Sequence, residues 1–374
     1  MIPVNQPAIA KNALRYVTDC VRSGWVSSVG SYIQKFEKST AAYLNARYAI
    51  TTTSGTAALH LALAALDVGP NDEVILPAHT MFACAAAIMY TGATPVLVDV
   101  ERDTWNMQVA QVEKKITKHT RVIMPVHIYG HSVDMDPLRA LAKKYHIAIV
   151  EDAAEAHGAT YKGKKVGTIG DINCFSFYAN KIVTTGEGGM VVTNSKKLAD
   201  RARMLKDMAH SPTRRFLHEE LGFNYRMTNL QAALGLAQLE EIDSFIKKKR
   251  WMANLYTELL STVPGITTPV ERPWAKSVYW MYAILIEDAF GMNRDTLAAK
   301  LKARGIDTRT FFISLHRQPA LTKRGLFRAE VHNYPVTDEI SERGMYLPSG
   351  LAITEKQIRT VAHEIATAHK TAHT

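Results

Sequence analysis

The stretch Ile149-Val150-Glu151-Asp152-Ala153-Ala154-Glu155-Ala156-His157-Gly158 joins an apolar run to a pair of acids. An apolar run that ends in this way is typical of a parallel strand whose carboxyl end lies at the ligand-binding edge of an open α/β sheet. A carboxylate at that edge could hold the protonated ring nitrogen of a cofactor. It could equally cap the next helix, so this stretch alone leaves both roles open.

On both sides of this stretch, apolar strand-like runs alternate with helical patterns. The expected strands are Glu73–Pro77, Thr94–Val98, Val122–Val126, Ile147–Val150, Ile172–Phe177 and Gly189–Thr193. The helical patterns between them include Thr56–Leu66, Phe82–Tyr90 and Pro137–Tyr145. The alternation predicts an α/β fold with a mostly parallel, doubly wound sheet that helices cover on both faces.

The last third of the chain has a different pattern. A long amphipathic helix is expected over Leu230–Lys249, and it would lead out of the sheet region. Beyond it, a β-like segment over Val278–Ile286 and helices over Arg294–Arg304 and Glu355–Ala368 indicate a smaller α+β unit. We therefore expect a large domain over residues 1–250 and a small C-terminal domain over residues 251–374.

Composition is that of an ordinary globular protein, with 47% hydrophobic and 21% charged residues in a chain of 374. The net charge of +10 favours anionic small molecules, because the basic residues are scattered and form no stripe or motif typical of nucleic-acid binding. The three cysteines form no CxxC pair, which fits a reducing compartment. With no signal-peptide pattern at Met1–Asn5 and no apolar run of membrane-spanning length, we expect a cytoplasmic protein.

A second motif, Cys174-Phe175-Ser176-Phe177-Tyr178-Ala179-Asn180-Lys181, places a lysine just after a short strand. The Gly-rich turn Thr184-Thr185-Gly186-Glu187-Gly188-Gly189 follows it, where backbone can approach a ligand closely. Lysine forms Schiff bases once it is neutral, and burial favours that state. A lone lysine is more often a surface residue, but the strand-end acid about thirty residues earlier favours a shared site.

A third motif, Thr52-Thr53-Ser54-Gly55-Thr56-Ala57-Ala58-Leu59, opens a helix with small and hydroxyl residues. The free backbone N–H groups and the dipole at such a helix start suit a phosphate group. The same pattern is also a common helix cap. Together the three motifs predict one site for pyridoxal phosphate (PLP), with phosphate on the helix, ring nitrogen on Asp152 and aldehyde on Lys181.

The motifs SGTAAL, EDAAEAHG, FSFYANK with TTGEGG, and GFNYRMTNLQAA resemble the DegT/DnrJ/EryC1/StrS family of PLP-dependent sugar aminotransferases. The resemblance runs in order from Gly24-Trp25-Val26-Ser27 to His316-Arg317-Gln318-Pro319. It implies a fold-type I aminotransferase, with Lys181 as the lysine that carries the cofactor and shuttles protons. Asp152 would be the partner of the pyridinium nitrogen. The phosphate-binding positions that it implies are Ser54, Gly55, Thr56 and Ser176.

Three further cofactor positions follow from the resemblance. Asn224 matches a residue that reaches the phosphate from the neighbouring subunit, which implies a homodimer with shared active sites. Glu155 stands where many relatives have Gln near the phenolic oxygen of the cofactor. Met81 departs from the pattern, because an aromatic residue usually stacks on the ring at this position; a thioether can still pack on a π face. The implied substrate-binding residues are Trp25, Ser27, His157, Arg226 and His316, although His157 could equally be structural.

The expected reaction is transfer of an amino group from glutamate to a nucleotide-linked keto-sugar. Glu155, Met81 and the segment Ser277–Tyr282 most resemble the perosamine-forming group of the family, which aminates C4 of GDP-4-keto-6-deoxymannose for polysaccharides such as the O-antigen of lipopolysaccharide. UDP- or dTDP-linked 3- or 4-keto sugars stay open. A PLP-dependent sugar dehydratase is another alternative, although relatives with that activity carry His where this chain has Lys181. A non-enzymatic PLP-binding regulator is a third alternative, disfavoured because the family pattern begins by about residue 24.

We expect no metal: His127 and His131 are four residues apart, but Gly130 and the strand before them argue against one helical face.

Overall fold

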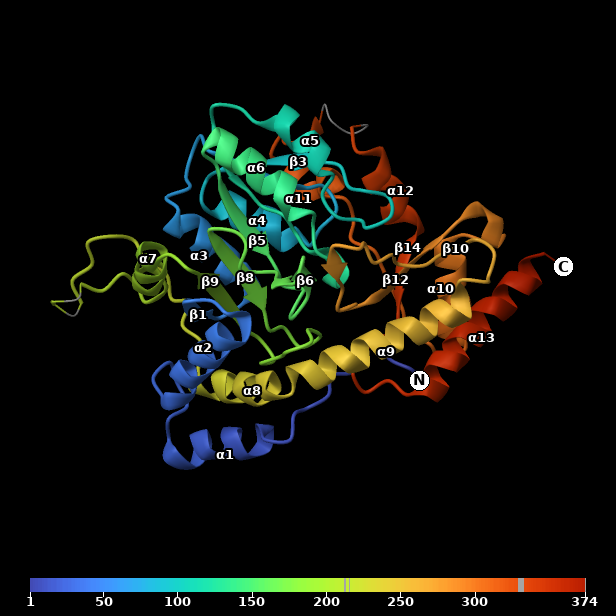
Figure 1. The fold of residues 1–374 in the computed structure, drawn as a ribbon, viewed down its shortest axis with the longest axis horizontal. Helices are drawn as coiled ribbons and strands as arrows, with labels where there is room; N and C mark the ends of the chain where they lie inside the picture. The colour runs from blue at the N-terminus through green and yellow to red at the C-terminus, as the bar shows by residue number, and fades with distance from the viewer. Residues whose placement is uncertain (212, 215, 329–332, 374) are drawn as a thin grey trace.

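The computed structural model describes residues 1–211, 213–214, 216–328 and 333–373. A seven-stranded sheet in the order β1-β9-β8-β5-β4-β2-β3 lies at its centre (Figure 1). Every neighbouring pair from β8 to β3 is parallel, and β9 alone runs antiparallel to both of its neighbours. The strands are β1 (Tyr48–Thr52), β2 (Glu73–Pro77), β3 (Thr94–Val98), β4 (Thr120–Ile123), β5 (Ala148–Asp152), β8 (Ile172–Ser176) and β9 (Gly189–Thr193). The expected mostly parallel α/β sheet is confirmed.

Helices cover this sheet, and β8 and β9 are buried along their whole length for that reason. Helix α3 packs on β8 and β9, while α1, α2 and α8 lie together beneath the sheet in the view of Figure 1. The helices of this part are α1 (Ala13–Ser23), α2 (Ser31–Leu44), α3 (Gly55–Ala65), α4 (Phe82–Tyr90), α5 (Val109–Val112), α6 (Met135–Tyr145), α7 (Lys196–Lys206) and α8 (Asn229–Glu240).

The long helix expected over Leu230–Lys249 is wrong, because two helices take its place: α8, and α9 over Ile242–Leu260. The chain leaves helical geometry at Glu241, whose φ and ψ are −108° and 9°. A tertiary contact accompanies the break, since the Glu241 carboxylate accepts a hydrogen bond of 2.8 Å from the backbone N–H of Lys11. The turn lets α8 stay beneath the sheet while α9 runs toward the C-terminal part (Figure 1).

A four-stranded antiparallel sheet in the order β10-β12-β14-β13 forms the C-terminal part. Its hydrophobic core, which includes Met252, Tyr282 and Ile358, is separate from the core around the large sheet. The first residues of the chain join this part through a bridge between Ile2 and Ile306. The elements of the chain after α9 include β10 (Ile266–Thr267), β12 (Tyr282–Ile286), β13 (Arg309–Thr310), β14 (Gly344–Leu347), α10 (Arg294–Ala303), α11 (Pro319–Thr322), α12 (Pro335–Arg343) and α13 (Glu355–Ala372), of which α11 and α12 pack Leu321 and Ile340 into the core of the large sheet. The division at residue 250 stays a prediction.

The strand expected over Val278–Ile286 begins only at Tyr282. The residues before Tyr282 lie outside the four-stranded sheet and pair with the large part. Val278 N–H donates to Gly130 O, and Trp280 N–H donates to Tyr129 O. Tyr279 takes a left-handed conformation with φ of 47° between these two bonds. A small sheet made of β6 (Thr160–Tyr161), β7 (Lys164–Lys165) and β11 (Ala275–Lys276) lies beside this crossing.

None of the helices in the described part of the chain is both long and apolar enough to span a membrane.

Candidate active site

Asp152 is the last residue of β5, at the carboxyl edge of the parallel strands, and it is buried. Both oxygens of its carboxylate are engaged. Oδ1 accepts from the backbone N–H of Ala154 at 3.0 Å, and Oδ2 accepts from Sγ of Cys84 at 3.0 Å. Burial and the negative charge of Asp152 raise the pKa of the Cys84 thiol well above its usual value, so this thiol stays a donor. The Asp152 carboxylate therefore has a fixed orientation.

Lys181 follows β8 and turns its side chain into the protein, where 10% of it is exposed. Its Nζ lies 3.6 Å from Oε1 of Glu155 and 3.7 Å from the centre of the Trp280 ring. Burial lowers the pKa of Lys181, although the carboxylates of Glu155 and Asp152 pull it upward. Lys181 therefore has the environment that favours a nucleophilic amine.

Glu155 connects Lys181 to the loop after β4. Its Oε2 accepts a hydrogen bond of 2.8 Å from the backbone N–H of Tyr129. Burial raises the pKa of Glu155, against the opposing pull of Lys181 and of the Tyr129 N–H. The structure thus brings Lys181, Glu155 and Asp152 together.

The start of α3 forms the expected small-residue turn. Ser54 caps the helix by accepting from Ala57 N–H, and the N–H groups of the first turn have no partner inside an α-helix. A Cβ placed on Gly55 would lie only 2.7 Å from Cβ of Ser176, so glycine allows the helix to approach the end of β8. The structure brings Ser54, Gly55, Thr56 and Ser176 to one place, a cradle of donors suited to a phosphate.

Two other sequence candidates border this region. His157 is buried against the rings of Phe175 and Phe177, and burial together with the charge of Lys181 lowers its pKa to about 3, so it is neutral. Met81 directly precedes α4, the helix that carries Cys84, and 51% of its surface is exposed. Met81 therefore stands one turn from the thiol that holds Asp152.

Trp25 and Ser27 lie on the surface, in the loop between α1 and α2. Asn229, the first residue of α8, holds this loop, because its side chain donates to Trp25 O at 2.7 Å and its backbone N–H donates to Ser27 O at 2.6 Å. The Trp25 ring itself is 57% exposed. Within one chain, the described contacts of these residues do not connect them with Lys181.

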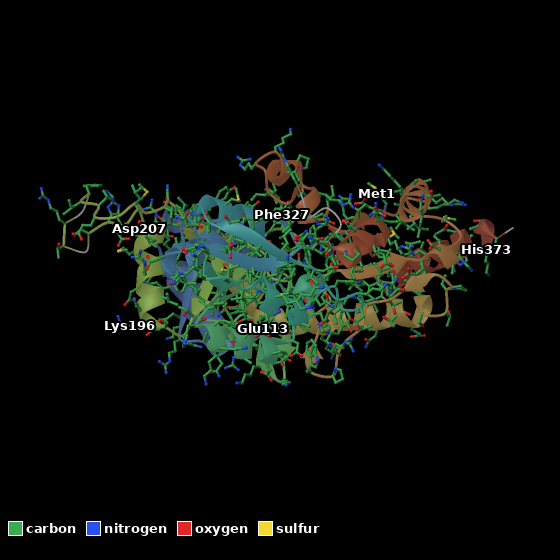
Figure 2. The ribbon with its side chains drawn as sticks, turned by 90° about the horizontal axis from the view of Figure 1, so that it is seen from above. Met1, Glu113, Lys196, Asp207, Phe327 and His373 are labelled. Carbon is green, nitrogen blue, oxygen red and sulfur yellow. The ribbon has the colours of Figure 1, made fainter. Side chains whose placement is uncertain are left out.

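Asp207 lies at the opposite end of the molecule from His373, where a segment projects from the body (Figure 2). A backbone bridge pairs Asn224 with Asp207, so Asn224 and Arg226 lie at the base of this segment. Arg226 joins the two edges of the segment, donating to Asn224 Oδ1 at 2.8 Å and to Asp207 Oδ1 at 2.6 Å. Asn224 is exposed. An exposed side chain at the base of a projecting segment is accessible to another chain.

His316 lies in a different environment from the other substrate candidates. It is fully buried, packs on the ring of Tyr334, and has Nε2 3.0 Å from Oδ1 of Asp338. Its neighbours Leu315 and Tyr334 belong to the core around the large sheet. Its role toward a substrate stays a prediction that these contacts do not favour.

Three contacts of the site were not found from the sequence. Trp280 is about a hundred residues from Lys181 in the chain, and no local pattern links the two. The bond from Tyr129 N–H to Glu155 depends on a left-handed residue with φ of 52°. Cys84 could have been found, because it lies three residues after Met81 on a helix whose bounds were expected.

The donor set fits PLP. A nearly buried lysine with a lowered pKa, a fixed carboxylate at a strand end, and a helix start that glycine brings against Ser176 are the three groups that the aldehyde, ring nitrogen and phosphate require.

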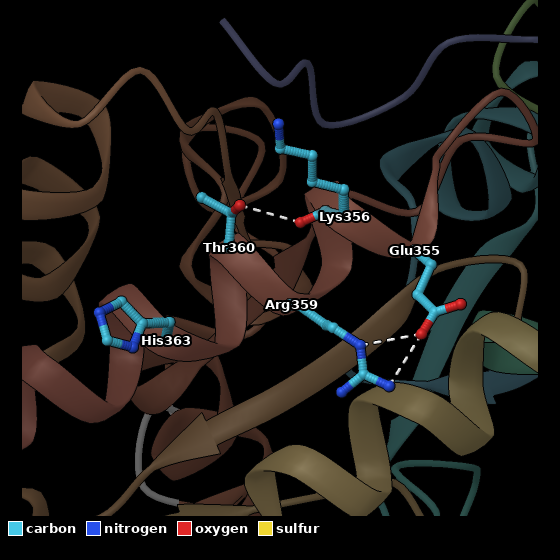
Figure 3. A pocket seen from close by; sticks show the side chains of 5 residues that line it. All are labelled: Glu355, Lys356, Arg359, Thr360 and His363. Atoms are coloured by element: carbon cyan, nitrogen blue, oxygen red, sulfur yellow. Dashed lines mark hydrogen bonds and ion pairs between the residues drawn. The ribbon is translucent and has the colours of Figure 1, made fainter.

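No group of three or more His, Cys, Asp and Glu side chains in the described residues could hold a metal ion. His127 donates instead to the buried Glu151, with a separation of 2.9 Å between Nε2 and Oε2. A surface hollow along α13, lined by Glu355, Lys356, Arg359, Thr360 and His363, contains none of the site residues (Figure 3). Its side chains belong to one helix, where Arg359 pairs with Glu355.

Known proteins that resemble this chain belong to one family. The model of the DegT/DnrJ/EryC1/StrS aminotransferase family matches residues 7–366. GDP-perosamine synthase of Escherichia coli O157:H7 is 43% identical over 97% of each chain. A dTDP-3-amino-3,4,6-trideoxy-alpha-D-glucose transaminase of Streptomyces venezuelae is 39% identical over 85% of this chain and 84% of the relative.

Solved structures agree with these relatives. The crystal structure of DesV from S. venezuelae has a TM-score of 0.89 and 36% identity, covering 96% of this chain and 94% of DesV. The PLP form of Spr1654 from Streptococcus pneumoniae has a TM-score of 0.93 and 28% identity over 99% of both chains.

The fold and the comparisons together define a PLP-dependent aminotransferase of fold type I. The chain belongs to the DegT/DnrJ/EryC1/StrS aminotransferase family, which consists of PLP-dependent sugar aminotransferases.

Proposed function

We propose that this enzyme transfers an amino group from glutamate to C4 of GDP-4-keto-6-deoxymannose and so produces GDP-perosamine. The observation that carries the proposal is the nearly buried amine of Lys181, placed beside Glu155 and within the field of Asp152. The choice of sugar rests on the 43% identity with a GDP-perosamine synthase over nearly the whole of both chains.

Lys181 and Asp152 would do the chemical work of the chain. PLP, when bound, supplies an aldehyde that condenses with amines and a ring that withdraws electrons from the adjacent carbon. Lys181 would hold the aldehyde carbon and, once an incoming amine displaces it, would move a proton between the substrate carbon and C4′. Asp152 would keep the ring nitrogen protonated through its negative charge. Cys84 and Ala154 fix the carboxylate in the orientation for this contact.

The other groups would orient the cofactor. The first turn of α3 and Ser176 would bind the phosphate through N–H and hydroxyl donors. His157 is neutral at physiological pH because its pKa is about 3, so it would pack or accept a hydrogen bond without adding charge near Lys181. Met81 would pack on one face of the ring.

A second candidate is amination of a UDP- or dTDP-linked keto-sugar, and the similarity to the dTDP-3-amino-sugar transaminase of S. venezuelae favours it. A sugar dehydratase on the same site is the third. Lys181 supports transamination over dehydration, because the amine is needed to return a proton to the carbon that receives nitrogen.

Incubating the enzyme with PLP, glutamate and each of the GDP-, UDP- and dTDP-linked keto-sugars tests the substrate. We expect an amino sugar by mass spectrometry, with stoichiometric 2-oxoglutarate, from GDP-4-keto-6-deoxymannose at the highest kcat/KM. Preference for a dTDP-sugar would establish the second candidate. A deoxygenated keto-sugar that retains no nitrogen would establish the third.

We also propose a homodimer in the cytoplasm, with domains over residues 1–250 and 251–374. Three large apolar side chains on or next to α1, Leu14, Val21 and Trp25, are 79%, 62% and 57% exposed, which supports a covering partner. Asn224 is exposed at the base of the projecting segment and would reach the phosphate of the partner. All three cysteines are free and buried, in keeping with a reducing compartment.

A further inference from the structure

The amino group of Lys181 lies between two groups that both favour a cation. Oε1 of Glu155 is 3.6 Å away on one side, and the centre of the Trp280 ring is 3.7 Å away on another. The carboxylate attracts an ammonium by its charge, and the face of an indole ring attracts it by its quadrupole. The distance to Oε1 is that of an ion pair and exceeds that of a hydrogen bond.

Glu155 is fixed in this position by a strained backbone. Its Oε2 accepts from Tyr129 N–H at 2.8 Å, and Tyr129 is a bulky residue in the left-handed conformation, with φ of 52°. Such a conformation costs free energy, and it persists where the surroundings enforce it. With Oε2 occupied by Tyr129, Oε1 is the oxygen left to face Lys181.

Trp280 is fixed through the same loop and through both parts of the molecule. Its indole Nε1–H donates to Asn180 O at 2.7 Å, and its backbone N–H donates to Tyr129 O at 2.9 Å. Its carbonyl accepts from Nζ of the buried Lys249 at 2.7 Å. Its ring is stacked on that of Tyr129, with an angle of 16° between the planes. The positions of Glu155 and Trp280 around the Lys181 amine therefore both depend on Tyr129.

Opposed effects act on the protonation of Lys181. Burial is the largest, and it lowers the pKa of the amine, while Glu155, Asp152 and Cys84 raise it. His157, the other titratable group that interacts with Lys181, is neutral. Of the groups that raise the pKa, Glu155 contributes most. Loss of the Glu155 carboxylate is therefore the change, among the groups that raise the pKa, that should lower the pKa of Lys181 most.

We propose that Glu155 and Trp280 form a holding site for the amino group of Lys181 whenever that group is not bonded to the cofactor, and that Glu155 sets how much of it is neutral amine. This proposal rests on the proposed role of Lys181 as the cofactor-bearing residue. Glu155 and Trp280 are positioning residues in this account. A lysine that leaves the cofactor needs a place to which it moves and from which it returns, carrying a proton. A carboxylate and an aromatic face provide that place without forming a covalent bond.

Competitive acetylation of the cofactor-free full chain tests the proposal directly. Trace acetic anhydride reacts with the neutral amine only, so the labelling of Lys181 against pH, measured by peptide mass spectrometry, gives its pKa. In Glu155→Gln the attraction of the carboxylate is lost while the shape is kept. We expect the pKa of Lys181 to fall by at least about one unit, which raises labelling at neutral pH about 10-fold. Trp280→Leu should raise labelling by about 3- to 10-fold, and Trp280→Phe by less.

The matched control is Glu37→Gln. Glu37 pairs with another largely buried lysine, Lys206, at 3.2 Å, away from the site. This variant should raise the labelling of Lys206 and leave that of Lys181 unchanged. Circular dichroism of each variant verifies that the fold is retained, and Glu155→Asp provides a second variant that keeps the charge at a greater distance and should shift the pKa less than Glu155→Gln does.

An unchanged or raised pKa of Lys181 in folded Glu155→Gln would overturn the proposal, as would equal labelling in Trp280→Leu and the wild type. This readout needs neither PLP nor a sugar. If Lys181 did not bind the cofactor, the labelling result would still hold, and separate measurement of cofactor binding would reveal that the proposed function had failed.

Discussion

His79 and His157 are both fully enclosed by protein, and burial lowers the pKa of each to about 3. His79 lies 3.2 Å from the hydroxyl of Tyr129, the residue that orients Glu155. His157 packs against the rings of Phe175 and Phe177. The neutral imidazole of His157 adds no positive charge beside Lys181, so the protonation of Lys181 depends on burial and on the nearby carboxylates.

These two histidines should make the fold sensitive to acid. The unfolded chain binds a proton at each imidazole near the ordinary value of 6.5, while the folded chain does so only near 3. Between these values the unfolded state binds more protons, so stability falls as the pH is lowered from 6.5 toward 3. Each histidine contributes about 1.4 kcal/mol per pH unit to this fall.

Denaturant unfolding of the cofactor-free wild type and of His157→Gln at pH 7.5, 6.0 and 5.0 measures that contribution. The remaining groups titrate in both proteins, so the difference between the two isolates His157. The unfolding free energy of His157→Gln should fall less steeply below pH 6.5, by about 1.4 kcal/mol per unit. Equal slopes would show that His157 is protonated in the folded state.

At the scale of elements, the start of α3 depends on its approach to the end of β8. In Gly55→Ala the new Cβ would lie 2.7 Å from Cβ of Ser176 and would push the helix start away from the hydroxyl. We expect the dissociation constant for PLP to rise about 10-fold or more, with a loss of about 1–3 kcal/mol in stability from the added methyl group.

Gly69→Ala is the matched control, because a Cβ there meets only Thr91 O, at 4.0 Å. Titration of each apoenzyme with PLP, followed by cofactor absorbance, gives both dissociation constants. Unchanged affinity in folded Gly55→Ala would mean that the phosphate binds elsewhere.

Much of this framework follows from local sequence. The bounds of β2, β3, β9 and α4 agree with expectation residue for residue, because apolar runs and flanking breakers encode them locally. The position of Asp152 at the end of a parallel strand follows in the same way. The break at Glu241 does not, since no Gly or Pro marks it and its contact with Lys11 is tertiary.

The contacts of the site that the sequence does not predict are also tertiary contacts. Trp280 reaches Lys181 because residues 277–281 lie outside the four-stranded sheet and pair with the loop at Tyr129 and Gly130. The apolar pattern of this segment continues into β12, so the sequence predicts one strand from Val278, whereas the strand begins at Tyr282. Contacts formed by residues in left-handed conformations, such as Tyr129 and Tyr279, have no period to detect.

At the scale of the whole molecule, the account requires two chains for each active site. Lys181 belongs to one chain and Asn224 would come from the other, so neither Lys181→Ala nor Asn224→Ala should be active alone. When the two inactive variants are unfolded and refolded together, each mixed dimer should regain one site with both wild-type residues. About a quarter of the wild-type activity should return for random pairing.

Activity of the mixture at the level of the separate variants would mean that each site is built from one chain. Light scattering of the same samples determines whether dimers formed, and thus separates failed assembly from an unshared site.

The central claim is that Lys181 carries PLP and accepts nitrogen from glutamate, and one spectral titration tests it most directly. Wild type and Lys181→Ala are each saturated with PLP, their absorbance spectra are recorded, and glutamate is then added while 2-oxoglutarate is measured. The account predicts a lysine-dependent band in the wild type alone, its loss on addition of glutamate, and one 2-oxoglutarate released per site. A wild-type spectrum equal to that of Lys181→Ala, or a band that glutamate leaves unchanged, would contradict it.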